Sequence, residues 1–203
     1  AHAKVFANID LAKRHGFRII LCTSVTAESV HGKDIELLLQ YAEDNAMPCV
    51  VSIPCPSGNW RGEDNMLLGD AERRRLDELL ARFPSFRRDF HSNYSKLGCS
   101  AGSEKLYITP TGEVIPCPFI HVSFGNIRTE PLATIRDRLL AYDRFTEYTP
   151  HCLAGEDKPF IDEVMTPTFN AKELPVQLEL HPVLQKVLEK VPRNWRSGKP
   201  SLN

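Results

Sequence analysis

The stretch that most constrains the fold runs from Gly98 to Asn126, where two cysteines bracket a short pattern of alternating β-formers. Residues 106–109 (Leu-Tyr-Ile-Thr) and 113–115 (Glu-Val-Ile) flank a loop that contains a proline and a glycine. Alternating strand residues on both sides of such a loop predict a β-hairpin. Because a hairpin brings its two ends together, we expect Cys99, before it, and Cys117, after it, to lie near each other.

The second of these cysteines stands on stiff backbone. Cys117 lies between Pro116 and Pro118, whose rings fix φ and which carry no backbone N–H. Two thiols on rigid backbone at one end of a hairpin predict a metal or iron–sulfur site. The alternative interpretation is that both cysteines are simply small buried side chains, as free cysteines often are.

The spacing of this stretch carries a family resemblance. Cys99, twelve residues, Gly112, four residues and Cys117 resemble the opening half of the SPASM/twitch motif of radical SAM enzymes. The continuation through Gly125-Asn126-Ile127 into a short helix is also similar. The resemblance implies an auxiliary 4Fe-4S cluster ligated by Cys99 and Cys117, with Cys152, the only cysteine downstream, as the third ligand. A full SPASM domain has a longer cysteine series, so the shorter twitch type is the one implied.

Three cysteines leave one iron of such a cluster without a thiolate. We expect that iron to hold a substrate atom or to take His121, His151 or another ligand. Thiolates suit iron–sulfur clusters because soft sulfur donors match iron. Zinc is the direct rival, since three cysteines and one of these histidines would complete a tetrahedral site. Spacing does not separate the two metals, and the family resemblance favours the cluster.

The residues before the hairpin alternate between helical and strand patterns. Alternation of this kind predicts a parallel sheet built from βα units, and the apolar, β-branched strands predict burial on both faces. By resemblance, residues 1–91 form the second half of the partial (β/α)6, TIM-like barrel of radical SAM enzymes. The expected elements are helices over 3–15, 35–46 (with Asp34 as N-cap) and 71–82, and strands over 17–25, 47–53 and 86–90.

Two strand ends are candidates for cofactor binding. By the family resemblance, Thr23, Ser24, Val25, Ser52 and Pro54 line an S-adenosylmethionine pocket, whereas the plain interpretation is that they only finish their strands.

The Pro- and Gly-rich loop 54–60 leaves the second strand at the end where ligands bind in such sheets. Cys55 lies in this loop, and its position is equally compatible with a structural and a functional role. Cys22 and Cys49 are expected in the core. The candidates to contact a substrate are His31, Asn59, Trp60 and Arg61.

The remainder of the chain is expected to form a second domain and a tail. Residues 92–166 would be a small α+β, twitch/SPASM-like domain that holds the hairpin and a helix over 131–142. Residues 167–203 would comprise a polar linker, a short helix opened by Pro182 and a loose tail. Three histidines are expected at the surface: His2, His15 and His181.

Composition limits the partners and the location. The 203 residues are 42% hydrophobic and 25% charged, as in ordinary globular proteins, and a net charge of −1 gives no argument for nucleic acid or a membrane as partner. No apolar run approaches the roughly 20 residues of a membrane span. Six cysteines are too sparse for a disulfide scaffold, which favours a cytoplasmic location.

The resemblance also implies an activity for a longer parent protein. In such enzymes S-adenosylmethionine is cleaved to a 5′-deoxyadenosyl radical that abstracts hydrogen from a substrate, here a peptide or small molecule, with flavodoxin or ferredoxin as electron donor. The catalytic CxxxCxxC triplet is absent from this sequence, which opens at Ala1 without a Met. We therefore expect a C-terminal portion that needs an N-terminal half-barrel, and leave open whether it is an enzyme by itself. The alternatives are a non-catalytic zinc- or cluster-stabilised binding module, and a metal-free α/β protein.

Overall fold

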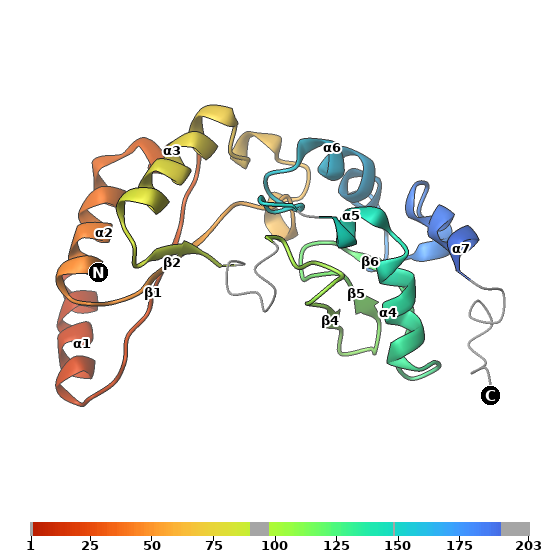
Figure 1. Cartoon of the computed structure of the whole chain (residues 1–203), viewed down its shortest axis with the longest axis horizontal. Coiled ribbons are helices and arrows are strands. Elements are labelled where there is room, and N and C mark those ends of the chain that lie inside the picture. Colours follow the sequence, from red (N-terminus) through yellow and green to blue (C-terminus); the bar gives the residue numbers. More distant parts are fainter. Residues whose placement is uncertain (1, 90–97, 148, 192–203) are drawn as a thin grey trace. The chain divides into compact units, whose positions relative to one another are not determined.

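The computed structural model describes residues 2–89, 98–147 and 149–191, which form two compact units (Figure 1). Unit 1 comprises the described residues of 1–54 and 66–89, and unit 2 those of 55–65 and 90–203. The loop 55–65 therefore belongs to unit 2 by its contacts, although it interrupts unit 1 in the sequence. The expected boundary at 91/92 lies outside the described residues.

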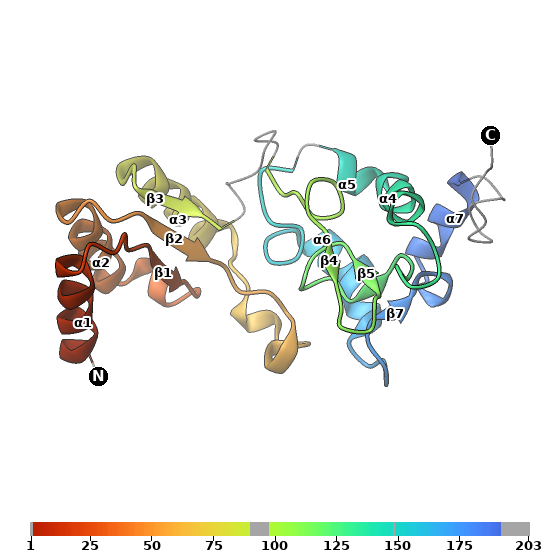
Figure 2. The ribbon, with the colours of Figure 1, turned by 90° about the horizontal axis from the view of Figure 1, so that it is seen from below.

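Unit 1 is built on a three-stranded parallel sheet with the order β1-β2-β3 (Figure 2). In register, Ser24 of β1 stands opposite Ser52 of β2, and Cys49 of β2 opposite Phe86 of β3. The prediction of a parallel sheet made of βα units is thus confirmed. The strands are β1 (Leu21–Ser24), β2 (Cys49–Ser52) and β3 (Phe86–Arg88), and the helices are α1 (His2–Arg14), α2 (Lys33–Asp44) and α3 (Asp70–Arg82).

The core of unit 1 lies between the sheet and the apolar faces of α2 and α3. Each fully buried aliphatic side chain there contributes about 1.5–3 kcal/mol relative to an exposed one. The end of α2 is tied to the start of β3, because the Glu43 carboxylate accepts hydrogen bonds from Ser85 N (2.9 Å) and Ser85 Oγ (2.6 Å). The buried residues at helical spacing are Ile35, Leu39 and Ala42 of α2, and Leu76 and Leu79 of α3.

Three expectations for unit 1 are wrong. The strand predicted over 17–25 is only Leu21–Ser24, and its burial alternates instead of being complete. Among the described residues β1 pairs with β2 alone, and Cys22 is exposed and not in the core. Asp34 is not the N-cap of α2: Gly32 is, and Asp34 lies in the first turn, where a carboxylate favours the helix dipole.

The second and third strands expected for this unit are present in the sheet. The second predicted strand is central in the sheet and buries Cys49 as expected. The strand predicted over 86–90 is β3, which ends earlier, at Arg88: Asp89 lies in a turn, and Phe90 lies outside the described residues.

Unit 2 contains the predicted hairpin. β4 (Tyr107–Ile108) and β5 (Val114–Ile115) pair antiparallel, with Ile108 opposite Val114. The turn closes through Gly112, whose φ of +92° is one that glycine adopts without strain. β6 (Val122–Ser123) follows and pairs in parallel with β7 (Val176–Gln177), which comes from much later in the chain.

Short helices and an aromatic cluster complete unit 2. The rings of Phe124, Tyr142, Phe145 and Phe160 pack with centroid distances of 5.0–6.5 Å. The helices are α4 (Leu132–Leu140), α5 (Asp143–Thr146), α6 (Lys158–Phe160) and α7 (Val187–Lys190); a π-helical turn covers Ile161–Met165, and a 3-10 turn covers Thr166–Thr168.

The C-terminal expectations are met in part. The short helix after Pro182 is confirmed as the 3-10 turn Leu184–Lys186 followed by α7, and the expected tail lies outside the described residues. The stretch after residue 166 is not wholly a linker, because Thr168 is buried and its hydroxyl donates to the Met165 carbonyl at 2.7 Å. Of the helices in the described part of the chain, none is long and apolar enough to cross a membrane.

Candidate metal centre

Four cysteine thiols of unit 2 come together around Cys152. The Cys152 thiol is hydrogen-bonded to the thiols of Cys55 and Cys99, and Cys117 is close enough for its charge to act on Cys152. The structure thus brings together the three cysteines that the sequence predicted and adds Cys55. The other two cysteines, Cys22 and Cys49, lie in unit 1.

Cys99 is placed by a backbone bridge to the segment that leads to Cys152. Gly98 pairs with Thr149, and Cys99 N donates to the Thr149 carbonyl at 2.8 Å. Gly98 has a φ of +80°, and a Cβ there would overlap the Thr149 carbonyl. Only glycine therefore allows these two segments to approach this closely.

Cys117 is placed by the hairpin. It follows β5 at the far end of the loop that starts at Cys99, and Gly102 N donates to the Pro116 carbonyl at 3.1 Å, which joins the two ends of the hairpin. Ile120 N donates in turn to the Cys117 carbonyl at 3.2 Å. The prediction that the hairpin brings Cys99 and Cys117 to one end is confirmed by these contacts.

Cys152 stands at the start of a tight turn that a buried carboxylate closes. Cys152 N donates to Glu156 Oε2 at 2.8 Å, and Glu156 N returns a hydrogen bond to the Cys152 carbonyl at 2.8 Å. Glu156 is only 5% exposed. This carboxylate is a positioning residue that sequence reasoning missed, and no motif marks it.

Cys55 reaches the site from the loop 55–65. It is buried, and Pro54 and Pro56 flank it just as Pro116 and Pro118 flank Cys117. This repeated Pro-Cys-Pro arrangement is the signal in the sequence that marks Cys55 as more than a loop residue. Its carbonyl accepts a hydrogen bond from Ser57 N at 2.8 Å, which fixes the loop locally.

The same loop lies against the loop that follows Cys117. Burial lowers the pKa of His121, and the nearby positive charge of Arg61 lowers it further, while the hydrogen bond to the Pro118 carbonyl opposes both effects. The ring nitrogen Nε2 of His121 is 3.0 Å from that carbonyl oxygen.

The neutral form is favoured at two of the thiols. The pKa of Cys99 is raised above its ordinary value, first by the hydrogen bond with Cys152 and then by burial. The pKa of Cys152 is raised mainly by the hydrogen bond with Cys55, against the hydrogen bond with Cys99, which lowers it. Since a metal binds the thiolate, its positive charge would have to displace these protons on binding.

The donor atoms of the site suit a metal, but their present placement does not. Four soft sulfur donors suit an iron–sulfur cluster or zinc. Across the described ranges, however, no three or more His, Cys, Asp and Glu side chains are placed to hold a metal ion as they stand. The donor set therefore fits a metal, while the thiols as they stand are hydrogen-bonded in pairs, so ligation would require them to move.

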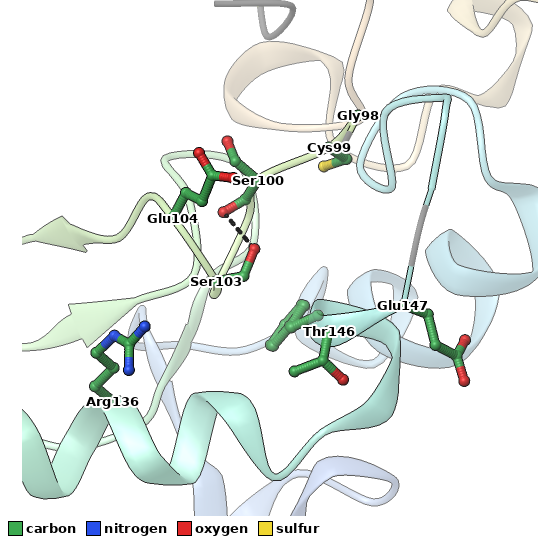
Figure 3. A pocket seen from close by; sticks show the side chains of 9 residues that line it. Gly98, Cys99, Ser100, Ser103, Glu104, Arg136, Thr146 and Glu147 are labelled. Carbon is green, nitrogen blue, oxygen red and sulfur yellow. Dashed lines mark hydrogen bonds between the residues drawn. The ribbon is translucent and has the colours of Figure 1, made fainter. Parts of the chain in front are cut away.

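A small pocket borders the site on the side of Cys99. Its volume is about 140 Å³, and it is lined by the loop 98–104, the end of α5 and Arg136 of α4 (Figure 3). Ser103 Oγ donates to the Ser100 carbonyl at 3.3 Å within this lining.

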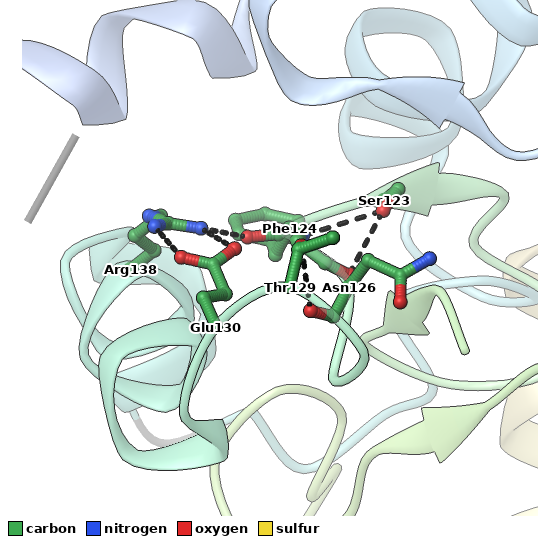
Figure 4. Close-up of polar contacts among 7 residues, drawn as sticks. Ser123, Phe124, Asn126, Thr129, Glu130 and Arg138 are labelled. Atoms are coloured by element: carbon green, nitrogen blue, oxygen red, sulfur yellow. Dashed lines mark hydrogen bonds and ion pairs between the residues drawn. The ribbon is translucent and has the colours of Figure 1, made fainter. Parts of the chain in front are cut away.

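A second pocket of about 510 Å³ lies over the ion pair of Arg138 with Glu130. Arg138 also donates to the Phe124 carbonyl at 2.7 Å (Figure 4).

The five residues predicted to line an S-adenosylmethionine pocket lie in unit 1. Thr23 and Ser24 end β1 beside Ser52 of β2, and Ser52 Oγ donates to Asp89 Oδ2 at 3.3 Å. Val25 and Pro54 are buried and offer no surface to a ligand at this edge. The cofactor role of these residues stays a prediction.

The remaining candidates for substrate contact belong to different units. His31 stands 3.4 Å from Glu72 in unit 1. Asn59, Trp60 and Arg61 lie on the loop 55–65 in unit 2.

Comparison with known proteins bears on the thiol site. The family model for SPASM, an iron–sulfur cluster-binding domain, matches residues 99–154. That range contains Cys99, Cys117 and Cys152 and leaves Cys55 outside. No curated protein and no solved structure matches the chain. Residues 99–154 are thus similar to the SPASM iron–sulfur cluster-binding domain, and the similarity covers the segment that carries three of the four thiols.

Proposed function

We propose that unit 2 is an auxiliary cluster module of the twitch type, in which Cys99, Cys117 and Cys152 ligate a 4Fe-4S cluster. The observation that carries this proposal is the meeting of the three thiols around Cys152, within the residues that are similar to the SPASM domain. Their separation in the sequence makes a chance meeting of three cysteines a poor explanation.

The chain's own residues hold and shield the site. The Gly98–Thr149 bridge and the Cys152–Glu156 turn set the positions of two ligands, and Pro116 and Pro118 hold the third. The three ligand residues are half-buried, which limits access of water, one of the ways in which a protein tunes an iron–sulfur potential. A cluster bound here would supply one-electron chemistry, and the protein would supply its position and surroundings.

For the longer parent protein we infer a radical SAM enzyme that acts on a peptide or small molecule. SPASM domains occur in such enzymes, and the parallel βα units of unit 1 are compatible with the second half of their partial barrel. S-adenosylmethionine would meet Thr23, Ser24 and Ser52 at the carboxyl edge of the sheet. The parent would need a CxxxCxxC triplet elsewhere and an electron donor such as flavodoxin or ferredoxin.

Anaerobic purification with iron, sulfide and zinc analysis tests the proposal. We expect about four irons and about four sulfides per chain, and their loss in Cys99→Ala and Cys117→Ala. Cys22→Ala is the matched control, because this exposed cysteine lies in unit 1 and should leave the metal content unchanged. One zinc per chain without sulfide would indicate a structural zinc module in place of the proposed cluster module. Absence of any metal would overturn both interpretations.

A further inference from the structure

We propose that Cys55 is the fourth ligand of this site, so that the cluster is held by four cysteines and has no iron open to a substrate. The inference rests on the proposed function and deepens it. It replaces the expectation of an open iron or a histidine ligand. Cys55 lies 44 positions before Cys99 and outside the segment that is similar to the SPASM domain.

The first support is direct contact. The thiol of Cys55 is hydrogen-bonded to the thiol of Cys152, which itself contacts Cys99 and lies near Cys117. Cys55 is 7% exposed, so its side chain is covered by the protein and not turned to solvent. Cys152 is thus the common neighbour of three other thiols, as expected of four ligands around one body.

The second support is the backbone that carries Cys55. The loop 55–65 belongs to unit 2, together with the other three thiols. It is compact: Ser57 N donates to the Cys55 carbonyl, and Trp60 N donates to the Ser57 carbonyl at 3.1 Å. A proline on each side of Cys55 restricts its backbone as at Cys117. A ligand held in this way loses little conformational freedom on binding.

The third support is that two competing side chains, those of His121 and Glu156, are already engaged in other hydrogen bonds. His121 places Nε2 on the Pro118 carbonyl, and Glu156 accepts the Cys152 N–H. Recruiting either of them would break an interaction that shapes a ligand loop. Cys55 is in contact with the thiol set already, and its sulfur is the donor that iron prefers.

Four cysteines would give the cluster a particular role. An iron without a thiolate can bind a substrate atom or exchange a small ligand, whereas a fully ligated cluster transfers electrons or stabilises the fold. If Cys55 ligates the fourth iron, the cluster serves electron transfer or structural support. The substrate then binds elsewhere. Cluster binding would also fix the loop 55–65 against the rest of unit 2, since the ligand belongs to that loop.

The test compares the full chain with Cys55→Ala, Cys55→Ser and the matched control Cys49→Ala, a buried cysteine of unit 1. Each protein is loaded with iron and sulfide anaerobically and examined by electron paramagnetic resonance. Spectra are taken after reduction, with and without cyanide, and after mild oxidation by ferricyanide. Circular dichroism records the fold of each variant.

We expect the wild type and Cys49→Ala to keep all their iron on oxidation. Their reduced spectra should be the same with and without cyanide. Cys55→Ala should lose about one iron in four on oxidation, with the signal of a three-iron cluster, and cyanide should shift its reduced spectrum. Cys55→Ser, which offers an oxygen in place of sulfur, should stay folded and keep a cluster with an altered reduced spectrum. It covers the case in which the alanine variant fails to fold.

Several results would overturn the proposal. A wild type that already loses iron or responds to cyanide has an open site, and Cys55 is then not a ligand. Cys55 variants whose spectra match the wild type would also exclude Cys55 as a ligand, while leaving the cluster itself in place. A wild type that takes up no iron and sulfide removes the proposed function, and with it the role of Cys55.

Discussion

At the scale of the residue, His181 is a polar side chain whose hydrogen-bonding groups are all used within the fold. It is fully buried, and both ring nitrogens are engaged. Nε2 lies 2.8 Å from the Val164 carbonyl, while Nδ1 accepts hydrogen bonds from Val183 N (3.2 Å) and Leu184 N (3.0 Å). Since Nδ1 is the acceptor, the ring is neutral with its proton on Nε2. The expectation of a surface histidine is wrong, because nothing in a lone His before Pro182 reveals that it closes a turn.

His181 should make stability depend on pH. Burial lowers its pKa below the ordinary 6.5, against the opposing hydrogen bond to Val164. As the pH falls below 6.5, the unfolded chain therefore binds a proton that the folded chain refuses, and the free energy of unfolding decreases. Urea denaturation across this range should show the decrease in the wild type and a flatter profile in His181→Gln. His15→Gln, at an exposed histidine, is the control and should keep the wild-type slope. Equal slopes in all three proteins would contradict the prediction.

Replacing either partner of the ion pair between Arg138 and Glu130 should strongly lower the free energy of unfolding. Both side chains are nearly covered, and Arg138 donates to both carboxylate oxygens and to Phe124 O. Removing one partner leaves the other charged group buried, which typically costs about 3–5 kcal/mol. We expect Arg138→Met and Glu130→Gln each to lower the free energy of unfolding by this order, and the double variant by less than their sum.

An exposed pair supplies the control. Lys190→Met breaks the contact with Asp143 on the surface and should change the free energy of unfolding by no more than about 1 kcal/mol. If the buried and exposed variants were equally mild, the Arg138–Glu130 pair would not be the support that its burial indicates.

At the scale of the element, the bridge between Gly98 and Thr149 should control metal loading. A Cβ on Gly98 would overlap the Thr149 carbonyl oxygen and lie 3.1 Å from Pro150 Cα. These are backbone atoms, so alanine has to separate the segments that carry Cys99 and Cys152. We expect Gly98→Ala to lower both the iron content per chain and the thermal midpoint.

Gly16→Ala is the matched control for this prediction. Gly16 lies in unit 1 and also has a positive φ, +79°, but a Cβ there meets nothing within 4 Å. Both variants carry backbone strain of about 1–3 kcal/mol, and only Gly98→Ala adds the collision. Equal iron content in the two variants would show that the bridge does not position the ligands.

The elements also show which parts of the structure the sequence could predict. The hairpin and α4 were predictable because turn residues and helical periodicity are local signals. Burial of β1 was not, because the cover of an apolar strand depends on tertiary neighbours, and within the described ranges β1 has β2 on one side alone. In the site, the hairpin predicted Cys99 and Cys117. Cys55 joins them only through tertiary contacts between loops, to which the Pro-Cys-Pro repeat was the single clue.

At the scale of the whole molecule, the outer edge of β1 lies beside exposed apolar side chains. Within the described part of the chain no strand pairs with that edge. The apolar side chains exposed around it include Phe17 (69%) and Ile20 (55%), just before β1. Unpaired strand edges beside exposed apolar groups promote pairing with another chain. In the radical SAM parent proposed above, a preceding half-barrel would cover this edge.

We therefore expect this chain on its own to self-associate through β1. Light scattering after size exclusion should give a mass above that of the monomer, and Ile20→Lys should shift it toward the monomer, because a charged side chain next to an edge strand opposes pairing. Leu180→Lys is the control: Leu180 is 76% exposed but lies in unit 2, so its replacement should leave the mass unchanged. A monomeric wild type would show that the edge is protected already. An equal response to both lysines would place the association on exposed apolar surface in general and not on β1.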